Sequence, residues 1–131
     1  MYSLNQLFSS LQNGQRAQKS LITIPKSKIC VELLNILLVE GLILGYGPSH
    51  NLNKKNQQNR LFVYLKYKNG EALIKQIRQI SSSGNRVYFK SRKIQELPSF
   101  SFVILSTSKG LMTCQKAANL GIGGEPFCQI F

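Results

Sequence analysis

Helical and strand-like hydrophobic patterns follow one another irregularly along this chain, and this limits the folds that it can adopt. Leu4, Leu7, Phe8 and Leu11 recur at the spacing of an amphipathic helix. Residues 61–68 instead alternate with a period of two, which is typical of a half-buried strand. Because no regular β-α-β order connects such segments, the pattern predicts an α+β fold with two small mixed halves packed together.

Turn and capping signals divide the chain into these two halves. For residues 1–68 we predict the order helix, strand, helix, strand, strand, with the first helix ending near Asn13-Gly14. Ser27 can cap the second helix, and Gly41 can stop it. We expect strands at residues 21–25, 42–46 and 61–68, and a long, Asn-rich loop at residues 47–60. The boundary is predicted at Asn69-Gly70, a strong hairpin signal.

The second half, residues 69–131, is predicted to consist mainly of strands with a short helix. Residues 71–80 fit either a helix or a bulged strand. Strands are expected at residues 86–89, 102–105 and 125–131, with a helical turn at residues 91–97. Thr113 can cap a short helix that reaches about Asn119, and Gly121 can close it.

The charge balance favours a polyanionic partner. The chain has 17 Lys and Arg against 5 acidic residues, a formal net charge of +12, and no Asp. Between residues 54 and 93 the only acid is Glu71, and aromatic residues alternate with the cations. Nucleic acid is therefore the first candidate partner and an anionic membrane surface the second. Among these aromatics, Tyr88 is the one we expect foremost to contact a ligand.

Two further segments carry the chemistry of an RNA contact. The segment from Ser106 to Glu125 opens with three hydroxyls at the end of a predicted buried strand and closes with a glycine pair. Hydroxyls both donate and accept, so they can bind mixed base and sugar edges, and glycines allow close approach. Glu125 is expected to hold the loop by accepting hydrogen bonds. Lys26, Ser27 and Lys28 lie at a helix start, where a phosphate can bind.

The chain resembles the bacterial-type family of small-subunit ribosomal protein eight. The similarity rests on STSKGLMT and GIGGE near the C-terminus, on ITIPKSKI and ILLVEGLI, and on GNRVYFKSRKIQELP. It covers nearly the whole chain in the same order. The resemblance implies a structural protein that binds the central domain of small-subunit ribosomal RNA, together with other small-subunit proteins, mainly through its C-terminal half. The RNA-binding residues it implies are Ser106, Thr107, Ser108, Lys109, Gly110, Gly123, Gly124, Glu125, Arg86, Tyr88, Lys26, Ser27 and Lys28.

Other function classes have less support. The single His50 has no Asp to orient it and no catalytic motif is present, so we expect no enzyme, no small-molecule substrate, no cofactor and no metal. Cys30, Cys114 and Cys128 are widely spaced, which argues against a disulfide framework or a zinc site. No apolar run reaches the length of a membrane span, and we expect no membrane partner.

Two alternatives stay open. A free regulator could bind a messenger that mimics the ribosomal RNA stem. For the compartment, ten Asn and no Asp suit an organelle-encoded chain. We therefore expect a mitochondrial ribosome, with a plastid or bacterial cytoplasm as the alternative, and no presequence is recognised before the first helix.

Overall fold

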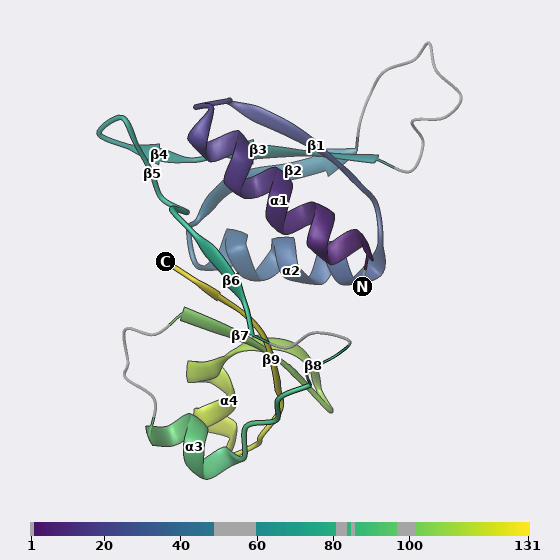
Figure 1. The fold of residues 1–131 in the computed structure, drawn as a ribbon, viewed down its shortest axis with the longest axis vertical. Coiled ribbons are helices and arrows are strands. Elements are labelled where there is room, and N and C mark those ends of the chain that lie inside the picture. The colour runs from purple at the N-terminus through teal and green to yellow at the C-terminus, as the bar shows by residue number, and fades with distance from the viewer. Residues whose placement is uncertain (1, 49–59, 81–83, 85, 97–101) are drawn as a thin grey trace. The chain divides into compact units, whose positions relative to one another are not determined.

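A computed structural model describes residues 2–48, 60–80, 84, 86–96 and 102–131, with side chains from residue 5 onward. Figure 1 shows its fold, in which helices combine with antiparallel sheets. The α+β class predicted from the sequence is confirmed. The chain forms two compact units, Met1–Lys75 and Gln76–Phe131. The boundary expected at Asn69-Gly70 lies earlier than this division, because that pair closes a hairpin belonging to the N-terminal unit.

The N-terminal unit has two helices and a three-stranded antiparallel sheet. Its sheet has the strand order β1-β3-β2. In chain order its main elements are α1 (Tyr2–Arg16), β1 (Leu21–Pro25), α2 (Lys28–Val39), β2 (Ile43–Pro48) and β3 (Arg60–Leu65). This matches the predicted order of elements. The ends of the segment predicted as an Asn-rich loop are strand residues, since β2 extends to Pro48 and β3 begins at Arg60. Its residues 49–59, including His50, lie outside the described part of the chain.

The first helix runs past the glycine that was expected to end it. The prediction of a stop near Asn13-Gly14 is wrong, because Gly14 is used for close packing. A Cβ at Gly14 would lie 2.6 Å from Ile22 Cγ2 and 3.0 Å from Leu65 Cδ1. The helix therefore continues to Arg16 with its glycine pressed against the sheet.

The second helix begins and ends as its capping residues predict. The Ser27 side chain accepts a hydrogen bond from the Cys30 backbone N–H at 3.2 Å, which satisfies a donor that the helix leaves free. Gly41 follows the helix with a φ of +76°, a left-handed conformation that favours glycine.

One face of this sheet is packed against the helices. Ile22 and Ile24 of β1 and Leu61, Val63 and Leu65 of β3 are buried, in the alternation expected of strands covered on one side. On β2, the Tyr46 hydroxyl donates to Asn35 Oδ1 of α2. Since Tyr46 pairs with Val63 and Gly14 packs on Ile22 and Leu65, both helices cover this same face.

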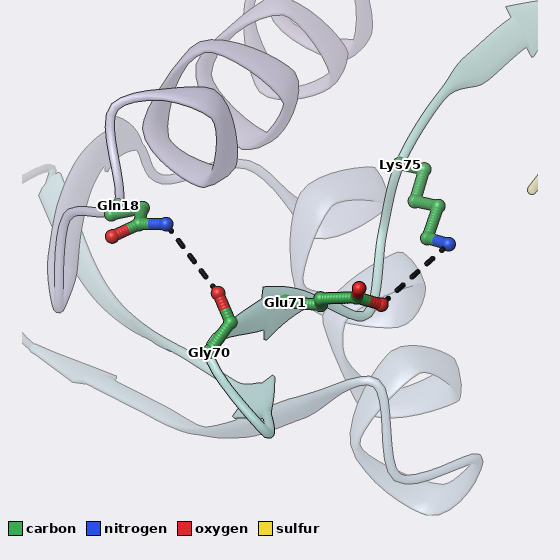
Figure 2. Close-up of polar contacts among 4 residues, drawn as sticks. All are labelled: Gln18, Gly70, Glu71 and Lys75. Carbon is green, nitrogen blue, oxygen red and sulfur yellow. Dashed lines mark hydrogen bonds and ion pairs between the residues drawn. The ribbon is translucent and has the colours of Figure 1, made fainter.

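A small hairpin completes the N-terminal unit. β4 (Tyr67–Lys68) pairs with β5 (Glu71–Ala72), and Asn69 and Gly70 at its tip have φ values of +54° and +78°. This confirms the hairpin signal in the sequence. Gln18 Nε2 donates to the Gly70 carbonyl at 3.4 Å, and Lys75 Nζ lies 4.0 Å from Glu71 Oε2; Figure 2 shows both contacts. Both contacts are exposed and add little stability.

The C-terminal unit is a four-stranded antiparallel sheet of order β6-β9-β7-β8 with two short helices. Its core includes Phe89, Val103, Leu105, Met112 and Ala117. Thr113 caps α4 and Gly121 closes it, as predicted. In chain order its elements are β6 (Ile77–Gln79), α3 (Ser91–Glu96), β7 (Phe102–Thr107), β8 (Gly110–Thr113), α4 (Cys114–Leu120) and β9 (Glu125–Ile130).

The strand predicted at residues 86–89 is not formed. Only Phe89 is paired, in an isolated antiparallel bridge with Gly124. The alternation of that segment reflects one buried side chain, Phe89, next to the exposed Tyr88, and no neighbouring strand runs alongside the preceding residues.

Candidate nucleic-acid interface

The hydroxyl-rich segment forms the end of a hairpin between β7 and β8. Ser106 and Thr107 are the last residues of β7, and Ser108 and Lys109 form the turn. Gly110 opens β8 with a φ of +103°, a conformation that a side chain would disfavour. The buried residues Val103, Ile104 and Leu105 anchor the strand, so the turn projects from a rigid base with Ser108 and Lys109 exposed.

The three hydroxyls differ in their surroundings. Thr107 Oγ1 donates to the Gly110 carbonyl at 2.9 Å and accepts from the Lys109 backbone N–H at 3.2 Å. Its proton is therefore used to hold the turn. Within the described part of the chain, the side chains of Ser106 and Ser108 form no hydrogen bond, so their donors and acceptors are available to a ligand.

The glycine pair is packed tightly between this strand and the segment that ends at Phe89. A Cβ at Gly124 would lie 2.6 Å from the Ser106 carbonyl oxygen and 2.8 Å from Thr107 Cγ2. A Cβ at Gly123 would lie 2.6 Å from the Phe89 carbonyl oxygen. All three distances are too short for a real side chain, so the two glycines are required for close approach of three backbone segments.

Hydrogen bonds join the same segments. The Phe89 N–H donates to the Gly124 carbonyl at 2.8 Å, and the Gly124 N–H donates to the Phe89 carbonyl at 2.9 Å. In the register of β7 and β9, Ser106 lies opposite Glu125, which is half-buried. The structure thus brings together the hydroxyl turn, the glycine pair and Glu125, as the sequence analysis grouped them.

The basic-aromatic segment leads directly into this arrangement. Arg86 is exposed, and the Tyr88 side chain is 67% exposed, one residue before the bridge at Phe89. A large aromatic side chain with that exposure is free to stack on a base.

The sequence analysis did not identify Phe89 and Lys93 as part of this surface. Lys93 Nζ lies 4.3 Å from the centroid of the Phe89 ring, a cation–π geometry that holds the ammonium over the buried ring. The sequence indicates this contact only weakly, because its pattern predicts Phe89 to be an ordinary buried residue of a strand. Its backbone bridge to Gly124 depends on a contact between distant parts of the chain.

Lys26, Ser27 and Lys28 belong to the N-terminal unit. They line a shallow surface depression together with Val31 and Glu32. The Ser27 hydroxyl is occupied as an acceptor by the helix cap, whereas Lys26 and Lys28 are exposed. These two ammonium groups can contact a phosphate at the start of α2.

Other kinds of site find no support in the described parts of the chain. No three His, Cys, Asp or Glu residues there gather as metal ligands would, and no helix there has the length and apolarity needed to cross a membrane. Cys30, Cys114 and Cys128 are buried free thiols, and burial raises the pKa of Cys128 to about 12.

Together, the two α+β units and the cationic surface with its hydroxyl turn are typical of RNA-binding proteins. The model of the family "Ribosomal protein S8" matches residues 3–131. A relative in Rhodospirillum centenum, named small ribosomal subunit protein uS8, is 36% identical over 132 residues, covering 98% of this chain and 96% of its own. A uS8 protein of Halothermothrix orenii is 35% identical over 127 residues, covering 95% and 93%.

The chain therefore belongs to the ribosomal protein S8 family. It is a structural protein of the ribosome and not an enzyme. The family resemblance stated from the sequence is confirmed.

Proposed function

We propose that this protein is a structural constituent of the small ribosomal subunit that binds the central domain of the subunit's RNA, mainly through its C-terminal unit. In this role it supports assembly of the subunit and translation. The observation that carries the proposal is the pair of hydrogen bonds between Phe89 and Gly124. This bridge joins the basic-aromatic segment, the glycine pair and the hydroxyl turn on one unit.

Within this surface, Ser106 and Ser108 bind base and sugar edges of an irregular RNA stem, because their hydroxyls are available on a rigid strand end. Thr107 gives the turn its shape and has a remaining acceptor lone pair. Lys109 binds a phosphate, and Gly110 permits the backbone conformation of the turn.

The neighbouring residues complete the interface. Gly123 and Gly124 support the RNA-binding surface from within, because they let the three backbone segments approach closely. Glu125 accepts hydrogen bonds that stabilise the turn. Arg86 supplies a phosphate contact, and Tyr88 stacks on an unpaired base.

Lys26, Ser27 and Lys28 of the N-terminal unit supply a further phosphate contact, with Ser27 capping the helix. The direct partners are thus the ribosomal RNA and neighbouring proteins of the small subunit.

The test is the binding of the purified protein to a central-domain fragment and to an unrelated stem of equal length, at moderate salt. We expect a preference of about a hundredfold or more, from about two good contacts of 1–3 kcal/mol each. Replacing Ser106 and Ser108 with Ala should remove most of that preference while leaving binding to the unrelated stem. Replacing the exposed Asn119 of α4 with Ala is the control in the same unit. Equal, salt-sensitive binding of the wild type to both stems would contradict the proposal.

Residence on the ribosome and the cellular compartment are two further parts of the proposal. Co-sedimentation with small subunits distinguishes ribosome residence from a free messenger-binding regulator, which we do not favour. For the compartment we propose a mitochondrial ribosome, supported by the ten Asn and the absence of Asp. A plastid or bacterial ribosome is the alternative, and the relatives named above are bacterial. Mass spectrometry of small subunits purified from each compartment decides between them.

A further inference from the structure

The sheet of the N-terminal unit has a second face that its helices do not cover. α1 and α2 pack on the face that carries Ile22 and Val63, and side chains alternate between the two faces along a strand. The other face, called the open face below, is defined by two rows of paired residues. In the register of the three strands these rows are Leu21, Tyr64 and Gly45, and Thr23, Phe62 and Gly47.

Two aromatic rings stand on the central strand of the open face. Tyr64 is 45% exposed and Phe62 is half-buried. They are two residues apart on the same face of β3, so their Cα atoms are separated by about 7 Å along the strand. Within the described part of the chain the Tyr64 hydroxyl has no hydrogen-bond partner, and its ring is one of the exposed large hydrophobic side chains.

On the neighbouring strand β2, glycines stand opposite both rings, and the bulge before Gly45 carries the exposed side chain of Leu44. Gly45 lies opposite Tyr64, and Gly47 lies opposite Phe62. Among the described residues, a Cβ at either glycine would have no atom within 4 Å. A flat ligand group can therefore lie against the rings without displacing a protein side chain.

The charges around the open face favour an anionic ligand. Arg60 is exposed two residues before Phe62, and Lys19 is exposed two residues before Leu21, so cations lie beyond both rows. None of the residues that define the face is acidic. Glu32 and Glu40 belong to α2 and its cap, and α2 packs on the opposite face.

Thr23, Pro25 and Arg60 also line a hollow with polar residues of α1, namely Asn5, Gln6, Ser9, Ser10 and Asn13. Its lining offers amide and hydroxyl groups around a guanidinium and no carboxylate. Such groups suit the sugars and base edges of a nucleic acid better than the apolar side chains of a protein segment.

We propose that the open face binds an unpaired segment of RNA, with successive bases stacked on Tyr64 and Phe62 and phosphates held by Arg60 and Lys19. Sheet-borne aromatic side chains that stack two bases are a known solution for single-stranded RNA. This site is additional to the stem-binding surface of the C-terminal unit and uses none of its residues.

The experiment measures fluorescence anisotropy of a labelled, unstructured RNA decamer with the full-length protein at moderate salt. Tyr64→Leu keeps an apolar side chain opposite Leu21 but removes the ring, and should weaken decamer binding by about 5- to 150-fold. Tyr64→Phe keeps the ring and should bind like the wild type. Val39→Ala is the matched control, since Val39 is 84% exposed on α2, which packs on the opposite face.

Decamer binding tests the open face, whereas binding of the central-domain stem tests the proposed function of the C-terminal unit. Binding of the central-domain stem should be unchanged in Tyr64→Leu, and loss of stem preference in the wild type would contradict only the earlier proposal. Arg60→Gln should weaken decamer binding and reduce its salt dependence. If Tyr64→Leu binds the decamer as tightly as the wild type, the open face does not bind RNA. If that variant instead loses a protein of the small subunit on purification, the face is a protein docking surface and the proposal is wrong.

Discussion

Replacing Gly124 with Ala is the sharpest test of the proposed interface, because the substitution adds one methyl group at the point where three segments meet. The new Cβ would lie 2.6 Å from the Ser106 carbonyl oxygen and 2.8 Å from Thr107 Cγ2. The carbonyl belongs to a strand paired on both sides, so it cannot rotate away as a flexible side chain could. The chain at Gly124 must move instead.

Two contributions determine how much Gly124→Ala destabilises the folded state. Forcing an extra carbon into a packed site costs about 1–3 kcal/mol. Movement of Gly124 also strains its hydrogen bonds of 2.8 and 2.9 Å with Phe89, and losing one of them costs about 1 kcal/mol. We therefore expect Gly124→Ala to lower the free energy of unfolding by about 2–4 kcal/mol. Displacing Phe89 should also move Tyr88 and weaken binding of the central-domain fragment.

The assay combines urea unfolding with binding of the central-domain fragment under conditions in which the variant is folded. Gly84→Ala is the control in the same unit, since a Cβ there would have no described atom within 4 Å. The control should change the free energy of unfolding by less than about 1 kcal/mol. Wild-type stability and wild-type RNA affinity in Gly124→Ala would refute the close-packing argument.

Three other predictions concern separate parts of the molecule. Ser27→Ala should lower the free energy of unfolding by about 1 kcal/mol, measured in urea, because the Cys30 N–H loses its acceptor; an unchanged value would show that the cap is not used. Replacing Lys66 and Lys68 with Gln should weaken cognate and unrelated RNA alike and flatten the dependence of affinity on salt; a loss confined to the cognate stem would contradict this. The pKa of Cys128 is raised from 9.0 to about 12 by burial, so the neutral thiol stabilises the folded state fully below pH 9. That contribution should fall as pH rises from about 9 toward 12, by up to about 1.4 kcal/mol per pH unit. Urea unfolding at pH 8 and pH 10.5 should therefore show a larger decrease for the wild type than for Cys128→Ala, and equal decreases would mean that the thiol is not buried.

The parts of the fold that the sequence predicts are those determined by neighbouring residues. Ser27 caps α2 by a bond to a residue three positions later, and Thr113 does the same for α4. Asn69 and Gly70 adopt the positive φ values that their residue types favour. Alternation along β3 correctly separates Leu61, Val63 and Leu65 from the exposed Tyr64, because the sheet is covered on only one face.

The predictions that failed depend on contacts between distant residues. Gly14 looks like a helix stop by itself, and only its packing against Ile22 and Leu65 explains why α1 continues. Residues 86–89 alternate like a strand, but a strand needs a neighbour, and only Phe89 has one, in Gly124. Neither contact leaves a local pattern in the sequence.

The hydroxyl turn shows the same limit within a functional site. In the sequence, Ser106, Thr107 and Ser108 are three equivalent candidates for binding RNA. In the structure, Thr107 uses its proton on Gly110 and accepts from Lys109, while the side chains of the two serines form no hydrogen bond with any other described residue. The turn can therefore be rigid before RNA binds, so that less ordering entropy opposes binding than for a flexible loop. A residue type indicates which chemistry is possible, and the internal hydrogen bonds decide which groups remain to perform it.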